Sequence, residues 1–472
     1  MIVGIVVAIH MVGLLMALRV LMLGRTAQGT VAWMLSLILL PYFALPLYGF
    51  FSHGKFRGYV IARRARGAQL ANLLKRVTEA IASAQAFCGA SRSTELAALE
   101  RLAGLPFTRG NSARLLVDGS SLFEDMLGGI RAARHYILVE FYVLRDDHLG
   151  RELQEVLLER AAAGVCVRVL YDDIGSETLT RSYVERLRAG GITISAFNGG
   201  KSWFVRHSRI NYRNHRKLVV VDGTTGWVGG FNVGDEYVDR DPILKPWRDT
   251  HVRVAGPSVL CCQIAFAEDW YWATGEVPDL RWEIELQTAE DRLVLVLPTG
   301  PADELETCGL AFGQMIASAR RRVWIASPYF VPDSATVSAL ALAAVRGADV
   351  RILLPGKPDH RLSWLAGLSY IPELTRAGVK IYLYDRGVLH QKVALFDDKL
   401  STVGTANFDN RSFRINFELT LAFLDEDFAR QVAEMLEGDM ACARRVPHRM
   451  LEGQPLPFRI AVQACRLLAP VL

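Results

Sequence analysis

The chain of 472 residues is long enough for a membrane segment and two ordinary domains. Hydrophobic residues make up 51% of it and charged residues 22%, which excludes a disordered chain because so much apolar surface can be buried. The formal net charge of +5 excludes a strongly basic nucleic-acid-binding protein, although local basic patches are allowed.

The N-terminal 66 residues are predominantly apolar and predict a membrane anchor. One apolar run covers residues 1–23 with two polar side chains, and a second covers residues 31–51. Each is about as long as a helix that crosses a hydrocarbon core of roughly 30 Å, so residues 1–66 are predicted to form a two-span transmembrane hairpin. A cleaved signal peptide is disfavoured, because no basic residue precedes the first run and no small-residue cleavage site follows it. Pro41 and Pro46 leave open a re-entrant or interfacial second segment.

Basic residues after the second run predict the orientation of this anchor. Five cations follow it: Lys55, Arg57, Arg63, Arg64 and Arg66. The positive-inside rule then places both termini and the main body in the cytosol. The cations would also attract anionic headgroups, at about 1 kcal/mol each, with a solvated basic loop as the alternative. Seven cysteines without a CxxC spacing agree with reduced thiols on the cytosolic side.

A helical connector, residues 67–111, leads into a body that contains one pattern twice. Helix, turn glycine and apolar strand follow one another in residues 112–282 and again in residues 283–445. Apolar strands that alternate with amphipathic helices predict an α/β fold with a largely parallel sheet covered by helices. The duplication predicts two such domains packed about a pseudo-two-fold axis, so that equivalent residues meet at one interface.

Each copy contains the motif H-x-K-x4-D, followed by a glycine-containing turn and an asparagine seventeen residues after the histidine. The residues are His215, Lys217, Asp222 and Asn232 in the first copy and His390, Lys392, Asp397 and Asn407 in the second. Since residues i and i+2 of a strand point to the same face, each histidine and lysine project side by side. A lysine beside a histidine repels a divalent cation but suits a phosphate, so no metal site is predicted. The aspartates fall at the strand ends and are predicted to support a turn.

With this paired motif, the sequence resembles the phospholipase D superfamily over residues 112–440. The segments SPYFVPD (327–333), WRDTHVRVAGPSV (247–259) and RINFELTL (414–421), together with the apolar N-terminus, resemble the bacterial cardiolipin synthases within it. The resemblance implies a bilobal fold of two phospholipase D-like domains and a ping-pong mechanism without metal or cofactor. It also implies phosphatidylglycerol as substrate and a multi-pass location in the bacterial cytoplasmic (inner) membrane.

The resemblance further implies the roles of individual residues. Catalytic roles carry over onto His215, Lys217, Asp222, His390, Lys392 and Asp397, phosphate binding onto Asn232 and Asn407, and orientation of the histidines onto Asp249 and Glu418. Within this set the two motif aspartates are assigned to structural support, and the two orienting acids have ordinary ion pairing as their alternative. His215 is assigned as the nucleophile and His390 as the general acid and base. Gly230 stands where the family motif usually has Ser.

Four further side chains are candidates of lower weight. Glu140, in the apolar segment ILVEFYVL, is either paired or lines the site. Tyr329 either shapes the substrate entrance or belongs to the core. His207 and His251 are interpreted as surface or core histidines rather than catalytic ones.

The chain ends in a tail, residues 446–472, in which Arg459, Gln463 and Arg466 form a polar stripe between apolar side chains. This pattern is compatible with a helix that lies in the headgroup region of a membrane. A helix packed on the body fits it equally well.

The predicted reaction transfers a phosphatidyl group from one phosphatidylglycerol to another through a phosphatidyl-histidine, forming cardiolipin and releasing glycerol. Hydrolysis to phosphatidic acid uses the same motif and is the nearest alternative. A nuclease is disfavoured by the apolar runs and the modest charge, and an inactive membrane scaffold by the complete His, Lys and Asn sets. The predicted partners are phosphatidylglycerol and membrane lipid but no nucleic acid, and a homo-oligomer is left open.

Overall fold

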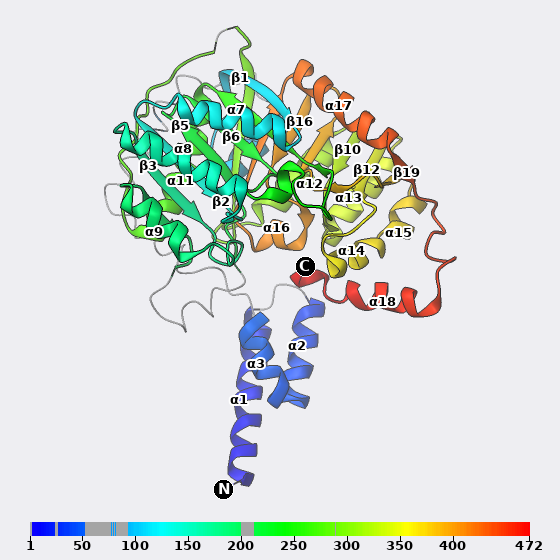
Figure 1. Ribbon diagram of the computed structural model, residues 1–472. Helices are drawn as coiled ribbons and strands as arrows, with labels where there is room; N and C mark the ends of the chain where they lie inside the picture. Colours follow the sequence, from blue (N-terminus) through cyan, green and yellow to red (C-terminus); the bar gives the residue numbers. More distant parts are fainter. Residues whose placement is uncertain are drawn as a thin grey trace. The chain divides into compact units, whose positions relative to one another are not determined.

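The computed structural model describes residues 2–23, 27–51, 77, 79, 81, 93–199, 212–287 and 289–472 (Figure 1). The chain divides into two units, Met1–Arg57 and Gly58–Leu472. The predicted basic flank at residues 55–66, most of the predicted connector before residue 93, and His207 lie outside the described residues.

The N-terminal unit consists of three apolar helices, α1 (Ile2–Leu23), α2 (Ala27–Leu39) and α3 (Pro41–Phe51). Among the described residues, α1 is the helix that is long and apolar enough to cross a membrane. The second apolar run forms two shorter helices, because Pro41 has no N–H to continue α2 and instead begins α3. The prediction of two membrane spans therefore stays a prediction.

The body is built on one sheet, which has fifteen strands among the described residues. The first half of the body contributes β1 (Thr108–Val117), β2 (Tyr136–Phe141), β3 (Cys166–Tyr171), β4 (Thr193–Ala196), β5 (Lys217–Val221), β6 (Thr225–Gly229) and β8 (Thr250–Ala255). The second half contributes β9 (Arg292–Thr299), β10 (Arg322–Ala326), β12 (Asp349–Pro355), β13 (Lys380–Tyr384), β15 (Val393–Phe396), β16 (Leu400–Gly404), β18 (Glu418–Leu424) and β19 (Ala443–Arg445). Four two-residue strands lie outside this sheet: β7 (Trp247–Arg248), β11 (Phe330–Val331), β14 (Val388–Leu389) and β17 (Phe408–Asp409).

The strand order is the same in both halves when each is followed toward the centre of the sheet. It runs β4-β3-β2-β5-β6-β8-β1 from one edge and, inside the edge strand β19, β13-β12-β10-β15-β16-β18-β9 from the other. β1 and β9 pair at the centre. The sheet is therefore continuous through both copies of the sequence pattern.

The prediction of a largely parallel sheet is wrong. Strands β2, β3 and β4 are parallel, as are β10, β12 and β13, but the other neighbouring strands in the described part of the sheet pair antiparallel. In two antiparallel pairs, β5 with β6 and β15 with β16, the physical reason is the short connection between successive strands. The turn from β5 to β6 spans residues 222–224, and only a much longer crossover returns a strand in the parallel direction.

Helices cover the sheet in both halves (Figure 1). In the first half they are α7 (Gly119–Arg131), α8 (His148–Ala162), α9 (Arg181–Ala189), the short η2 (Asp235–Val238) and α11 (Pro257–Thr274). In the second half they are α12 (Thr307–Ser318), α13 (Ser334–Val345), α14 (Arg361–Leu368), α15 (Ile371–Arg376), α16 (Asn410–Arg414), α17 (Glu426–Ala441), α18 (Leu456–Arg466) and the short η3 (Ala469–Val471), and α6 (Thr94–Ala103) precedes the sheet. One hydrophobic cluster packs α7, α8 and α9 on the first half, and a second packs α6, α12 and α13 on the other.

Candidate active site

Two short stretches of parallel strand pairing, one for each motif copy, hold the motif beside the opposite half of the body. Strand β14, just before His390, pairs with β7, and the N–H of His390 donates to the carbonyl of Arg248 at 2.8 Å. In the same way, the residue before His215 bridges to Phe417, and the N–H of His215 donates to the carbonyl of Phe417 at 2.9 Å. Each histidine is therefore held beside a segment of the other half that carries an acid one residue later.

Both motif histidines are hydrogen-bonded to buried carboxylates, and the pairing is crosswise. Nδ1 of His215 lies 2.9 Å from Oε2 and 3.1 Å from Oε1 of Glu418. Nδ1 of His390 lies 2.6 Å from Oδ2 of Asp249. A carboxylate that accepts the Nδ1 proton leaves Nε2 as the basic nitrogen of the ring. The structure thus brings together the two acids and the two histidines that the sequence singled out.

The motif lysines are buried next to the same histidines. Nζ of Lys217 donates to the carbonyl of His215 at 2.6 Å and lies 5.2 Å from the centre of the Tyr142 ring. Nζ of Lys392 donates to the carbonyl of His390 and lies 3.2 Å from its Nε2. Two lysines and two carboxylates therefore share one site. Burial lowers the pKa of Lys217 and that of Lys392, the latter to about 8, and the nearby carboxylates oppose this shift. Both ammonium groups are placed where they can offset the charge of a bound phosphate.

Burial controls the ionisation of this site. It lowers the pKa of His215 to about 4 in spite of the charge of Glu418, and together with Lys392 it lowers the pKa of His390. Burial alone would raise the pKa of Asp249, but the charges of Lys392 and His390 outweigh it and hold that pKa below its usual value. The same balance, with His215 as the principal partner, lowers the pKa of Glu418. At neutral pH the site therefore holds two ionised acids and a neutral His215.

The two asparagines come from the turns that follow β6 and β16, and both are buried. Nδ2 of Asn232 donates to the hydroxyl of Tyr237 at 2.9 Å, and the Tyr237 ring lies 6.4 Å from the ring of His390. The N–H of Asn407 donates to Oγ of Ser412 at 3.1 Å. These contacts fix both turns, and the role of the asparagines in phosphate binding stays a prediction.

The motif aspartates lie at the far ends of the motif strands. The carboxylate of Asp222 accepts the backbone N–H groups of residues 134–136, and that of Asp397 accepts those of residues 320–322. Both aspartates have φ of 54°, in the left-handed region. Five residues of roughly 3.3 Å each separate Asp222 from Lys217. The structure therefore places the aspartates in supporting turns, away from the atoms that would touch a phosphate.

A buried polar network lies behind the first motif histidine. Oε1 of Glu140 accepts from Nδ2 of Asn214 at 2.5 Å, and the same amide donates to Oδ2 of Asp269 at 3.1 Å. Arg216 donates through Nη1 to Asp269 at 2.6 Å and through Nε to the carbonyl of Glu418 at 3.1 Å. Burial and the charge of Asp269 raise the pKa of Glu140. Of the two interpretations of Glu140, pairing is the one that the structure supports.

The other two described candidates, His251 and Tyr329, form hydrogen bonds with residues that do not belong to the paired motif. His251 is buried, and its Nδ1 accepts the N–H of Phe231 at 3.3 Å, as expected of a core histidine. The hydroxyl of Tyr329, a half-buried residue, donates to Oδ2 of Asp359 at 2.5 Å.

Sequence reasoning missed Thr405, whose hydroxyl donates to Oε2 of Glu418 at 2.6 Å. The corresponding residue of the first copy is Gly230, where an added Cβ would lie 2.0 Å from Oδ1 of Asp249. The two acids are thus held differently, Glu418 by a hydroxyl and Asp249 by close packing against a glycine. The matching positions of Thr405 and Gly230 in the two turns were the available signal.

Two aromatic side chains that the sequence reasoning also missed flank the histidines. The Tyr142 ring lies 4.9 Å from the ring of His215, and the Trp247 ring lies 5.1 Å from that of His390. Tyr142 is two residues after Glu140, on the same face of an extended segment, which was the available signal. Trp247 opens one of the segments on which the resemblance rests.

Comparison with known proteins adds independent findings. A family model described as "Cardiolipin synthase, PLD-like domain" matches residues 126–241 and 312–440. The chain is 47% identical to a protein of Pseudomonas entomophila named Cardiolipin synthase A, with 98% of this chain and 97% of that protein covered. It is 45% identical to the protein of the same name from Pseudomonas fluorescens, with the same coverage.

Solved structures show a similar fold at low sequence identity. The crystal structure of phosphatidylserine synthase from Haemophilus influenzae matches with a TM-score of 0.62 at 15% identity, covering 80% of this chain and 100% of that chain. Polyphosphate kinase from Porphyromonas gingivalis matches with a TM-score of 0.51 at 13% identity, covering 76% of this chain and 52% of that chain. At such identities the likeness concerns the fold alone.

Proposed function

The chain belongs to the cardiolipin synthase family of phospholipase D-like enzymes and is a phosphatidyltransferase, and from this premise we propose that phosphatidylglycerol is both its donor and its acceptor. The enzyme joins the phosphatidyl group of one phosphatidylglycerol to the terminal hydroxyl of a second and releases glycerol. The observation that carries this proposal is the crosswise pairing of two buried histidines with two carboxylates. It supplies two imidazoles with a basic Nε2 in one site.

In the first step, Nε2 of His215 attacks the phosphorus of the donor lipid, so that a P–N bond forms and the P–O bond to the glycerol headgroup breaks. The departing glycerol oxygen takes a proton from Nε2 of His390. Glu418 stabilises the positive charge that develops on His215, and Asp249 stabilises the protonated His390 before the transfer. The two motif lysines offset the charge of the phosphate oxygens.

In the second step, the terminal hydroxyl of another phosphatidylglycerol attacks the phosphatidyl-histidine. Its proton passes to Nε2 of His390, the P–N bond to His215 breaks, and cardiolipin leaves the site. Water at the same position would yield phosphatidic acid instead. We assign to Tyr142 and Trp247, which pack against the two histidines, the role of restricting water around the intermediate.

Two observations support His215 as the nucleophile. Its lowered pKa of about 4 leaves it unprotonated at neutral pH, as a nucleophile must be. Its partner Glu418 also accepts from the hydroxyl of Thr405 at 2.6 Å and from Nδ2 of Asn416 at 3.1 Å, so the carboxylate that aims this ring is firmly held. His390 takes the role of proton carrier.

Product analysis tests the reaction. Purified enzyme that receives phosphatidylglycerol alone is expected to form cardiolipin and glycerol in equal amounts, with phosphatidic acid as a minor product. Mass spectrometry of the lipids and an enzymatic assay of glycerol give the two yields. Phosphatidic acid as the main product would identify a hydrolase. Cardiolipin that forms only after another phospholipid is added would reject phosphatidylglycerol as the donor.

The proposed roles require opposite protonation states, which predicts a bell-shaped pH profile of kcat/KM on the acid side of neutrality. In the free enzyme His215 must be neutral and His390 protonated. Burial lowers the pKa of His215 to about 4 and, with Lys392, holds that of His390 below 6.5. The rate is therefore expected to fall as the pH drops through about 4, and to fall again as it rises through the pKa of His390.

Two matched lysine variants check this profile with dispersed short-chain phosphatidylglycerol. The charge of Lys217 lowers the pKa of His215, and that of Lys392 lowers the pKa of His390. Lys217→Met should therefore move mainly the acid limb to higher pH. Lys392→Met should move the other limb to higher pH and the acid limb by less, because Lys392 acts more weakly on His215 than Lys217 does. Each loss of a phosphate contact also lowers the maximal rate, by about 10²-fold or more. If Lys217→Met instead moved mainly the limb at higher pH, and Lys392→Met mainly the acid limb, the roles of the two histidines would be exchanged.

We also propose that the domains at residues 112–282 and 283–445 are related by a pseudo-two-fold axis. The matching strand orders from β4 to β1 and from β13 to β9 support this symmetry. The apolar helices α1 to α3 are proposed to anchor the enzyme, as a multi-pass segment, in the bacterial cytoplasmic membrane, with the body in the cytosol. The basic residues at 55–66 support this orientation.

A further inference from the structure

The C-terminal helix α18 is packed on the body by one face and exposes apolar side chains on another. Val462 is fully buried, and the ring of Phe458 lies 6.4 Å from that of Trp364 in α14. On the exposed side, Leu456 is 65% and Ile460 is 59% accessible to solvent. The helix is therefore fixed by its inner face, and its exposed apolar side chains do not result from an unpacked tail.

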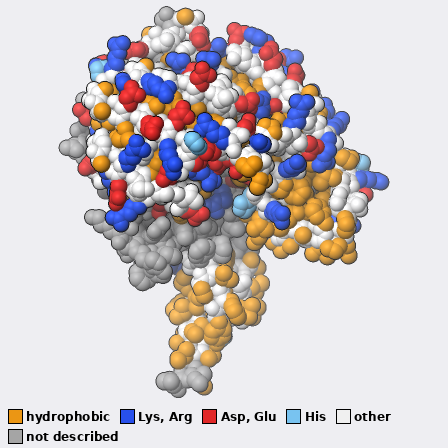
Figure 2. Space-filling model, in the orientation of Figure 1, with side chains coloured by type: hydrophobic (Ala, Val, Ile, Leu, Met, Phe, Trp, Pro, Cys, Tyr) orange, Lys and Arg blue, Asp and Glu red, His pale blue; other side chains and the backbone are white. Residues whose placement is uncertain are grey.

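The exposed side chains form a continuous feature, which we call the C-terminal apolar patch. It consists of Leu362, Leu456, Ile460, Leu467 and Leu468, all of them exposed. Figure 2 shows hydrophobic side chains gathered over the region of α14 and α18, at the lower right of the body. Single exposed hydrophobic residues need no explanation, but gathered ones mark a surface that another apolar partner covers.

The charged residues of the tail that carries most of the patch are basic, and one of them, Arg466, is paired with Glu373 of α15. Residues 455–472 include Arg459 and Arg466 but no Asp or Glu. Arg459 is exposed, and Arg466 lies over the ring of Tyr370 with its carbon Cζ 4.8 Å from the ring centre. Arg361, which begins α14, is also exposed. An apolar surface with cations at its border suits the interface of an anionic bilayer.

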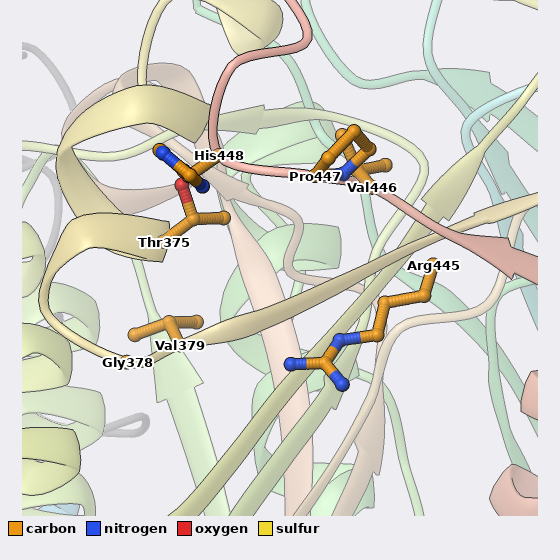
Figure 3. A pocket seen from close by; sticks show the side chains of 7 residues that line it. All are labelled: Thr375, Gly378, Val379, Arg445, Val446, Pro447 and His448. Atoms are coloured by element: carbon orange, nitrogen blue, oxygen red, sulfur yellow. The ribbon is translucent and has the colours of Figure 1, made fainter.

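A pocket with one arginine in its described lining lies close to the patch. It has a volume of roughly 550 Å³, and its described lining includes Thr375, Arg445 and His448 but no carboxylate. Figure 3 shows His448 beside Thr375, with Arg445 extending along the opposite side. Helix α15 connects the two features, because its Glu373 pairs with Arg466 of α18 at 3.5 Å and Thr375 follows two residues later.

We propose that the C-terminal apolar patch docks on the surface of an anionic bilayer and that the pocket at Arg445 and His448 receives a lipid phosphate. The choice of a bilayer as partner rests on the proposed function, which requires the body to work on membrane lipid. A second copy of the chain is the less suitable partner. A two-fold contact through this patch would bring its own arginines together, and like charges repel.

Depth-dependent fluorescence quenching in the full chain tests the docking. A cysteine at position 456, in a background without Cys88, Cys166 and Cys442, carries an environment-sensitive fluorophore. The enzyme is reconstituted into phosphatidylcholine vesicles with or without phosphatidylserine, and a nitroxide is attached to the lipid chains. We expect strong quenching of this label in the phosphatidylserine vesicles and none for a label at Glu434, an exposed position on α17. A label at position 456 that stays unquenched in both vesicles would overturn the proposal.

Matched variants separate the patch from the pocket. Ile460→Glu with Leu467→Glu should lower the ratio of docked to undocked label about tenfold or more, because each buried apolar side chain that is lost weakens partitioning. Ile243→Glu, which alters an apolar residue that is 86% exposed on a different loop, should leave that ratio unchanged. Arg445→Ala with His448→Ala should abolish the difference between the two kinds of vesicle, and a preserved difference would reject the pocket.

Two further measurements complete the test. All of these variants should form cardiolipin at the parental rate from detergent-dispersed phosphatidylglycerol, which separates failed docking from a failed proposal for the reaction. Fluorescence that changes with protein concentration in the absence of lipid would assign the patch to a second copy and reject the bilayer as its partner.

Discussion

Replacing His390 by alanine is expected to leave a phosphatidyl group trapped on His215. The variant cannot protonate an alkoxide, but a p-nitrophenyl ester of the phosphatidyl group has a leaving group that needs no proton. Attack by His215 therefore continues, while nothing activates the hydroxyl of a second lipid. The loss of general acid and base catalysis typically costs about 10²- to 10⁴-fold, which leaves a measurable burst of p-nitrophenol. Mass spectrometry of the intact protein and of its peptides locates the adduct.

The variant His215→Ala is the matched control, because it changes the corresponding residue of the other motif copy. It is expected to give no burst and no adduct, since the nucleophile is missing. The reverse result would exchange the roles: an adduct on His390 in the His215→Ala variant, and none on His215 in the His390→Ala variant. Loss of an acid partner is expected to have a smaller effect, because each acid orients its histidine and stabilises the positive charge on it but neither bonds to phosphorus nor transfers the proton.

Replacing Arg216 by methionine is expected to destabilise the body by about 3–5 kcal/mol. The guanidinium lies 2.6 Å from Oδ2 of the fully buried Asp269, so its removal leaves a carboxylate without its principal cation. Glu140, buried in the same network, adds a second acid to that environment. The midpoint of thermal unfolding of the purified enzyme in detergent, compared with that of the parent, measures the loss.

The corresponding residue of the second copy provides the control. Nε2 of Gln391 donates to Oδ2 of Asp439 at 3.1 Å, but that carboxylate keeps Arg248 as its cation at 2.8 Å. Gln391 also donates to Oγ1 of Thr250 at 3.0 Å, so Gln391→Met should cost about 2 kcal/mol, at the usual net value of about 1 kcal/mol for each of two hydrogen bonds. Arg216→Met combined with Asp269→Leu should regain much of the lost stability, because the carboxylate that lost its ion-pair partner is then also removed. Equal losses from the two single variants would rule out the ion pair as the cause.

The motif strands could be predicted because their signal is local. Four apolar residues follow Lys217 and form β5 with it, and Asp222 comes where that strand ends. The spacing i, i+2 also placed His215 and Lys217 together, and the repetition of the pattern marked both copies. The two-residue spacing of the histidine and lysine in each motif is enough to place their side chains on one face, and this inference does not require knowledge of the neighbouring strands.

The crosswise pairing of histidines and acids could not be predicted, because it depends on contacts between distant segments. His215 and Glu418 are 203 positions apart, and the register that joins them comes from a single bridge beside Phe417. Strands of one or two residues leave no periodic pattern in a sequence. Strand direction could not be predicted either, because side chains point alternately to the two faces of a sheet in parallel and in antiparallel strands. For this reason the largely parallel sheet was predicted in error.

The crosswise pairing also has a consequence for the growing polypeptide. His215 leaves the ribosome well before Glu418, and at about 5–20 residues per second the missing 203 positions take roughly 10–40 s to synthesise. During this interval the nascent chain carries the proposed nucleophile without the carboxylate that orients it. If the proposed roles hold, lipid cleavage begins only after Glu418 has been synthesised and the second half has folded against the first.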